Sequence, residues 1–96
     1  MNEKARNLKK QWKAAQKNVA RTQFPLSDDK LEAMFDAVER SLENNGCDHS
    51  QRATITWLTA NGFDVDTVVQ WLENNGGFCD CEVVANARDH WEENRR

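Results

Sequence analysis

The three cysteines of the sequence stand in two short phrases of similar composition. Cys47 is followed by an aspartate and then by His49, and Cys79 is followed by an aspartate and then by Cys81. Thiolates and imidazole are ligands that tetrahedral zinc prefers in proteins. If the fold brings the two phrases together, they supply four such ligands. The sequence therefore predicts a Cys3His zinc site that is closed to water and structural in role.

Acidic residues accompany both phrases. Carboxylates next to metal ligands accept hydrogen bonds from them, and one such group can orient the free ring nitrogen of His49. The residues predicted for this supporting role are Asp48, Asp80 and Glu82. A bound ion would also help a small core to fold, because its binding free energy becomes folding free energy.

Other interpretations of the cysteines are open. Cys47 and Cys79 can be small buried hydrophobic side chains, with His49 a polar residue at a helix start. Alternatively, Cys47 forms a redox disulfide with Cys79 or Cys81. A catalytic zinc would need His49 to point away, leaving three thiolates and a water with Glu82 as general base. Since no phosphate-binding glycine loop or serine-centred triad accompanies the cysteines, we expect a protein that is not an enzyme.

Helices with glycine stops must position the two phrases. Ser27 is a good N-cap for a helix with one apolar face that ends at Gly46. A second helix ends at Asn61-Gly62, and a third starts from Asp64 and ends at Asn75-Gly76-Gly77. Two consecutive helices that pack antiparallel return the chain to the side from which it left. We therefore expect both phrases at one end of the molecule.

Composition limits the protein to one small domain. The chain has 96 residues, of which 39% are hydrophobic and 30% are charged. This is enough for a thin core, and small cores often need a metal or a covalent link. No apolar run approaches the roughly 20 residues that span a bilayer, and no signal peptide is visible. We therefore expect a cytoplasmic protein with reduced thiols.

Charge is distributed unevenly along the chain. Residues 1–23 carry seven basic side chains and one acidic side chain, whereas residues 24–83 carry three basic and twelve acidic ones. Apolar residues recur at helical spacing in the basic segment, which indicates an amphipathic helix. The simplest interpretation is a peripheral helix docked on the body through Trp12 and Val19. Its candidate contacts to a nucleic acid or a partner are Lys9, Lys10, Lys13, Lys17 and Arg21.

The expected fold class is all-α, a small bundle of four to five helices with a structural metal site at one end. Residues 1–23 form the basic arm, residues 24–86 the helical core domain, and residues 87–96 a polar tail that can be helical. Val83 and Val84 either begin a last helix or pair in a short extended segment. Trp91 can be a core anchor or an exposed contact residue, and Trp12 likewise.

The phrases "CDH" and "WLENNGGFCDCEVVAN" carry a resemblance to a known family. Residues 24–86 resemble a small bacterial family of unknown function (domain of unknown function, family 2695), in which a Cys-Asp-His phrase is paired with a Gly-Gly-(Phe or Tyr)-Cys-Asp-Cys-Glu phrase. The sequence departs from that pattern at Ser50, where threonine is common, and in its residues after Asn86. The resemblance implies that Cys47, His49, Cys79 and Cys81 belong to one motif. It implies no activity.

Three classes of function compete. The preferred one is a small non-enzymatic interaction or adaptor domain, stabilised by zinc, whose basic arm makes weak and salt-sensitive contact with RNA or an acidic partner. The alternative is a metal-free helical protein-binding module, similar to a ubiquitin-associated-type three-helix fold, with Trp57, Phe63 and Trp71 as anchors. A zinc enzyme is the third class. Sequence-specific DNA recognition is not expected, because the helix after Asp64 has acidic residues and no Lys or Arg. The sequence predicts no membrane partner, and it indicates no oligomeric state.

Overall fold

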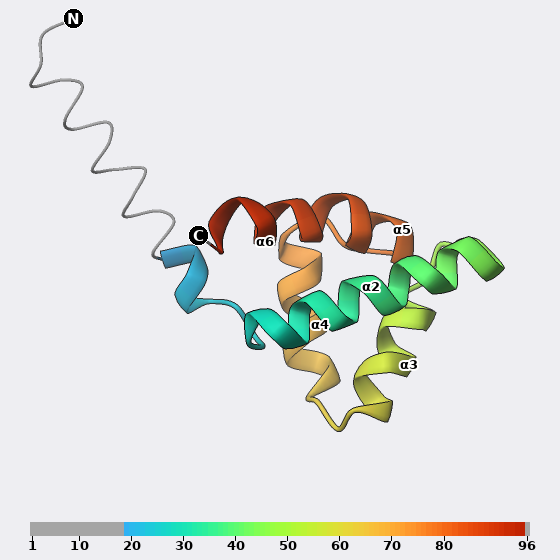
Figure 1. Cartoon of the computed structure of the whole chain (residues 1–96), viewed down its shortest axis with the longest axis horizontal. Coiled ribbons are helices and arrows are strands. Elements are labelled where there is room, and N and C mark those ends of the chain that lie inside the picture. Colours follow the sequence, from blue (N-terminus) through green and yellow to red (C-terminus); the bar gives the residue numbers. More distant parts are fainter. Residues whose placement is uncertain (1–18, 96) are drawn as a thin grey trace, which may run out of the picture.

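The computed structural model describes residues 19–95, and within this range every regular element is helical (Figure 1). A helical turn at residues 19–22 precedes α2 (Asp28–Asn45), α3 (Arg52–Ala60) and α4 (Val65–Asn74). The chain then forms α5 (Asp80–Glu82), a π-helical turn η1 (Val83–Ala87) and α6 (Arg88–Asn94) without interruption. The predicted all-α class is confirmed.

The longest helix, α2, begins and ends where its sequence signals place it. The hydroxyl of Ser27 accepts from the backbone N–H of Lys30 at 3.4 Å, and two aspartates occupy the first turn, at the positive end of the helix dipole. At the other end the N–H of Gly46 donates to the carbonyl of Leu42 at 2.8 Å. One face of α2 is buried in the core, through Leu31, Met34, Phe35 and Val38.

The helices α3 and α4 end in the same way, at a glycine with positive φ. Gly62 has φ +75° and Gly76 has φ +83°, a region that favours glycine because it lacks a Cβ atom. In each case the next residue donates its N–H back into the helix, from Phe63 to Leu58 at 3.0 Å and from Gly77 to Leu72 at 2.7 Å. These reversals send the chain back across the bundle.

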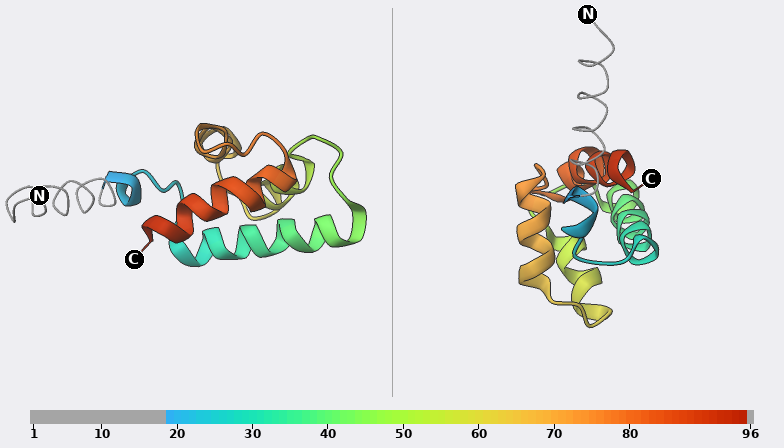
Figure 2. Two further views of the ribbon diagram at one scale, coloured as in Figure 1. Left: turned by 90° about the horizontal axis from the view of Figure 1, so that it is seen from above. Right: turned by 90° about the vertical axis from the view of Figure 1, so that its left-hand side faces the viewer.

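The C-terminal helical run closes the core. Val83 and Val84 lie in the helix rather than in an extended segment, and Val83 is fully buried. Trp91 is only 2% exposed, and its ring lies 5.4 Å from that of Phe35. Its indole N–H donates to a carboxylate oxygen of Asp28 at 2.9 Å. Trp91 is therefore a core residue, and α6 lies alongside the first half of α2 (Figure 2).

The segment between the basic arm and α2 also contributes to the core. Phe24 is half-buried and meets Trp71 edge to face, with ring centroids 5.8 Å apart. Most of the predicted arm, including Trp12 and the four lysines Lys9, Lys10, Lys13 and Lys17, lies outside the described residues. Val19 and Arg21 are described and are exposed. Within residues 19–95 there is no helix both long enough and apolar enough to cross a membrane.

Candidate metal centre

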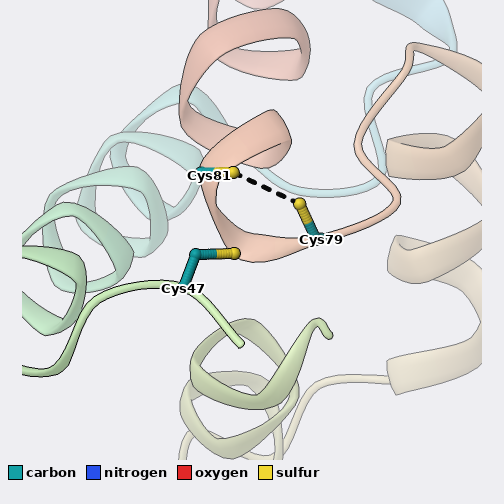
Figure 3. Close-up of side chains that lie close together, drawn as sticks. All are labelled: Cys47, Cys79 and Cys81. Carbon is teal, nitrogen blue, oxygen red and sulfur yellow. Dashed lines mark hydrogen bonds between the residues drawn. The ribbon is translucent and has the colours of Figure 1, made fainter. Parts of the chain in front are cut away.

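Three sulfur atoms from two distant parts of the sequence meet at one end of the bundle (Figure 3). Cys47 lies in the loop between α2 and α3, Cys79 directly precedes α5, and Cys81 lies within it. Their Sγ atoms all lie within 4.8 Å of one another, and those of Cys79 and Cys81 are 3.3 Å apart. Zinc–sulfur bonds of about 2.3 Å at tetrahedral angles place two sulfurs about 3.8 Å apart. The three cysteines therefore lie close enough to hold a metal ion.

Asp80 fixes the two cysteines that flank it. Its side chain is buried, and one carboxylate oxygen accepts from the backbone N–H and the hydroxyl of Thr54, at 3.2 and 2.8 Å. The other oxygen accepts from the N–H of Ala53 at 3.0 Å, and the backbone N–H of Asp80 donates to the carbonyl of Ser50 at 2.9 Å. A carboxylate is favoured here because the first N–H groups of a helix lack partners within the helix. These bonds join the start of α5 to the start of α3.

A second hydrogen bond joins the loop before α3 to the loop before α5. The side-chain amide of Gln51 donates to the carbonyl of Gly77 at 2.8 Å. Gly77 has no room for a side chain, because an added Cβ would lie 3.0 Å from the carbonyl oxygen of Leu72 and 3.2 Å from a methyl of Val83. The loop between α4 and α5 therefore packs closely against Leu72 and Val83. This packing holds Cys79 near the loop that carries Cys47.

His49 and the predicted supporting carboxylates occupy different places. The imidazole of His49 is not among the atoms of the three-sulfur group; the residue is exposed and has φ +68°. Asp48 accepts from the N–H of Ser50 at 3.0 Å and lies 3.8 Å from Arg52, so it stabilises its own loop. Glu82 is half-buried and is also outside the group. The structure thus brings together Cys47, Cys79 and Cys81, whereas Asp80 accepts hydrogen bonds from the start of α3.

The protein environment acts in opposite directions on two of the sulfurs. The backbone N–H groups of Cys81 and then of His49 face the Cys47 sulfur and hold its pKa below the ordinary 9.0. The N–H of Glu82 likewise favours a thiolate at Cys79. Burial and the two neighbouring thiols nevertheless outweigh it and raise the pKa of Cys79 to about 12. Cys47 therefore ionises more readily than Cys79, and a cation close to Cys79 would favour its thiolate.

Two residues of this corner were not singled out from the sequence, Thr54 and Gln51. Thr54 is fully buried on α3, one turn before the core residue Leu58. A polar residue on the apolar face of a predicted helix was the available signal, because a buried hydroxyl needs a hydrogen-bond partner. Gln51 carries no comparable signal, since its partner is a backbone carbonyl of a distant loop.

The aromatic anchors of the alternative protein-binding interpretation divide into two groups. Trp71 is buried in the core. Trp57 and Phe63 are half-buried and stack on each other, with centroids 5.7 Å apart and planes inclined by 22°. His90, the other histidine, is half-buried, and its ring lies beside those of Phe24 and Trp71.

Comparison with known proteins places the chain among bacterial relatives. A sequence model described as "Protein of unknown function (DUF2695)" matches residues 34–86, a range that contains all three cysteines. An uncharacterised protein of Mycobacterium bovis is 36% identical over 82 residues, which covers 84% of this chain and 82% of the relative. Uncharacterised proteins from two strains of Mycobacterium tuberculosis match to the same extent. No solved structure matches. By the family match over more than half of its length and by these relatives, the chain belongs to the DUF2695 family of proteins of unknown function.

Proposed function

We propose that the protein is a small non-enzymatic interaction domain whose helical body is stabilised by one zinc ion bound to Cys47, Cys79 and Cys81. The observation that carries this proposal is the convergence of three sulfurs within 4.8 Å from the α2–α3 loop and the start of α5. Thiolates are soft ligands that select zinc, monovalent copper and iron–sulfur centres over magnesium and calcium. Among these, zinc has no redox chemistry and is the ion most typical of structural sites with cysteine ligands.

The role proposed for the ion is structural. An ion shared by the three sulfurs links the loop after α2 to the start of α5, segments that are otherwise joined near the site by hydrogen bonds of Asp80 and Gln51. A cation beside Cys79 would also favour its thiolate, whose formation burial and the two neighbouring thiols oppose by raising the pKa. Because the binding free energy of such an ion is folding free energy, the domain should be markedly more stable when loaded.

The interaction role is supported by charge and by a half-buried aromatic pair. The body of the protein is acidic and the first 23 residues are basic, so the two parts favour different partners. We expect the arm to bind RNA or an acidic partner weakly, with an affinity that falls as salt rises. The half-buried pair of Trp57 and Phe63 offers a separate surface for a protein partner. Reduced cysteines fit the cytoplasm, which is the location proposed for this protein.

Metal analysis tests the proposal directly. Protein purified without chelator should contain one zinc per chain, and cobalt substitution should give the strong sulfur-to-cobalt absorption of a thiolate site. Cys79→Ser should lose both signals, whereas Ser41→Ala, a change at a half-buried position of α2 that is not a cysteine, should keep them. Folded protein without metal, and without cobalt uptake when reduced, would overturn the proposed site.

The arm needs a separate experiment. Binding of a fluorescent single-stranded RNA should be measured against salt concentration for the full chain and for a variant in which Lys9, Lys10, Lys13 and Lys17 are replaced by Gln. The full chain should show the steeper dependence on salt, because each neutralised phosphate releases counterions. Equal affinity of the two proteins would remove the arm from the proposed function.

A further inference from the structure

Within residues 19–95, the group of His, Cys, Asp and Glu ligand atoms that lie within 4.8 Å of one another at this corner consists of the three sulfurs. Both oxygens of Asp80 are engaged by the start of α3, and those of Asp48 by Ser50 and Arg52. The imidazole of His49 and the carboxylate of Glu82 lie outside the group. Within the part of the chain that the structure describes, the group thus offers three donors where tetrahedral zinc takes four.

The three cysteine residues differ in their exposure to solvent. Cys79 is buried, with 7% of its surface exposed, whereas Cys47 is half-buried and Cys81 is exposed. Figure 3 shows Cys47 and Cys79 carried by two loops and Cys81 on the first turn of the C-terminal helical run. A donor from solution can therefore approach the group on the side of Cys81. A closed structural site would have its fourth protein ligand in this position.

From this geometry we infer that the zinc ion keeps an exchangeable fourth position that takes a low-molecular-weight thiol from solution. The inference rests on the proposed zinc site and adds a ligand class to it. When the thiol binds, its S–H proton goes to solvent, a water molecule leaves the ion, and a zinc–sulfur bond forms; no electrons are transferred. Four thiolates around zinc are a common stable set, which favours a thiol over a carboxylate or a hydroxyl compound.

Charge selects among thiols. A divalent ion with three thiolates carries a net charge of −1, and Asp48 and Glu82 lie next to Cys47 and Cys81 in the sequence. An anionic thiol is therefore repelled, while a cationic one is attracted, within about a Debye length of the site. The expected order of affinity is cysteamine first, then 2-mercaptoethanol, then mercaptoacetate.

Cobalt-loaded full-length protein provides the test, in wild type, His49→Ala and the control variant His90→Ala. Addition of each thiol should increase the sulfur-to-cobalt absorption until it saturates, with equal amplitude in all three proteins and tightest binding for cysteamine. A response confined to His49→Ala would show that His49 closes the site and would overturn the inference while leaving the zinc site intact. No response in any protein would also overturn it. Failure to take up cobalt, which is seen before any thiol is added, would overturn the proposed zinc site together with this inference.

Discussion

The two ends of α2 are joined to the rest of the molecule by different kinds of contact. Near its start, Trp91 buries a large ring against Phe35 and donates a hydrogen bond to Asp28. Beyond its end, the hydrogen bonds of Asp80 hold the chain, and three free cysteines lie close together, of which one is exposed. The first end is stabilised by the burial of apolar side chains, which requires no bound ion. The second end has a cluster of three ionisable sulfurs that lie close enough to hold a metal ion, and the proposed zinc would add its binding free energy to folding there.

The largest effect is expected at the apolar end. Trp91→Ala removes the ring that closes the core and should lower the free energy of unfolding by about 3–5 kcal/mol. The loss should be the same with and without zinc, because Trp91 lies at the opposite end of α2 from the sulfurs. Urea unfolding followed by circular dichroism measures it. Trp91→Phe, which keeps most of the ring volume, should lose much less.

Zinc should stabilise the protein at the end of α2 near the sulfurs and not at the end near Trp91. At a free zinc concentration 100 times its dissociation constant, the ion should raise the free energy of unfolding by about 2.7 kcal/mol. A chelator should reverse the gain, and hydrogen exchange should then increase first around residues 46–51 and 77–82. The matched variant Cys79→Ser should show no response. An equal gain in that variant would mean that zinc stabilises the protein elsewhere.

Asp80→Asn tests the hydrogen bonds between the start of α5 and the start of α3 without changing a cysteine. An amide oxygen can accept only part of what the carboxylate accepts from Ala53 and Thr54, so the free energy of unfolding should fall by about 1.5–3 kcal/mol. Zinc affinity should fall as well, because Cys79 and Cys81 flank the substituted residue. The control is Asp36→Asn, an exposed position on α2, which should change neither quantity. Equal effects of the two substitutions would refute the role given to Asp80.

The metal-free protein should also respond to pH. Because burial and neighbouring thiols raise the pKa of Cys79 from 9.0 to about 12, folding favours its protonated form. This contribution is complete below pH 9 and is lost as the pH rises from 9 toward 12. The lowered pKa of Cys47 acts in the opposite sense, but its contribution is already complete above pH 9. Stability of the reduced protein, measured by urea unfolding, should therefore decline between pH 9 and 12, and less so in Cys79→Ser.

Local patterns predicted most of the helical structure. The apolar face of residues 28–45, the N-cap Ser27 and the glycine stops at Gly46, Gly62 and Gly76 each act within a few residues, so they can be read directly from the sequence. The approach of Cys47 to Cys79 and Cys81 also followed, because two consecutive helices return the chain to its starting side. The orientation of His49 could not be predicted in this way, since it depends on the positive φ of one loop residue.

The sequence by itself determined which segments are helical, where they stop and which side chains are available as metal ligands, because propensity, capping and side-chain chemistry are local properties. Only the tertiary structure decided that Asp80 binds the start of α3, that Trp91 closes the core and that the sulfur group contains three donors. These features depend on the relative placement of helices distant in sequence, and that placement is set by the packing of the whole core at once.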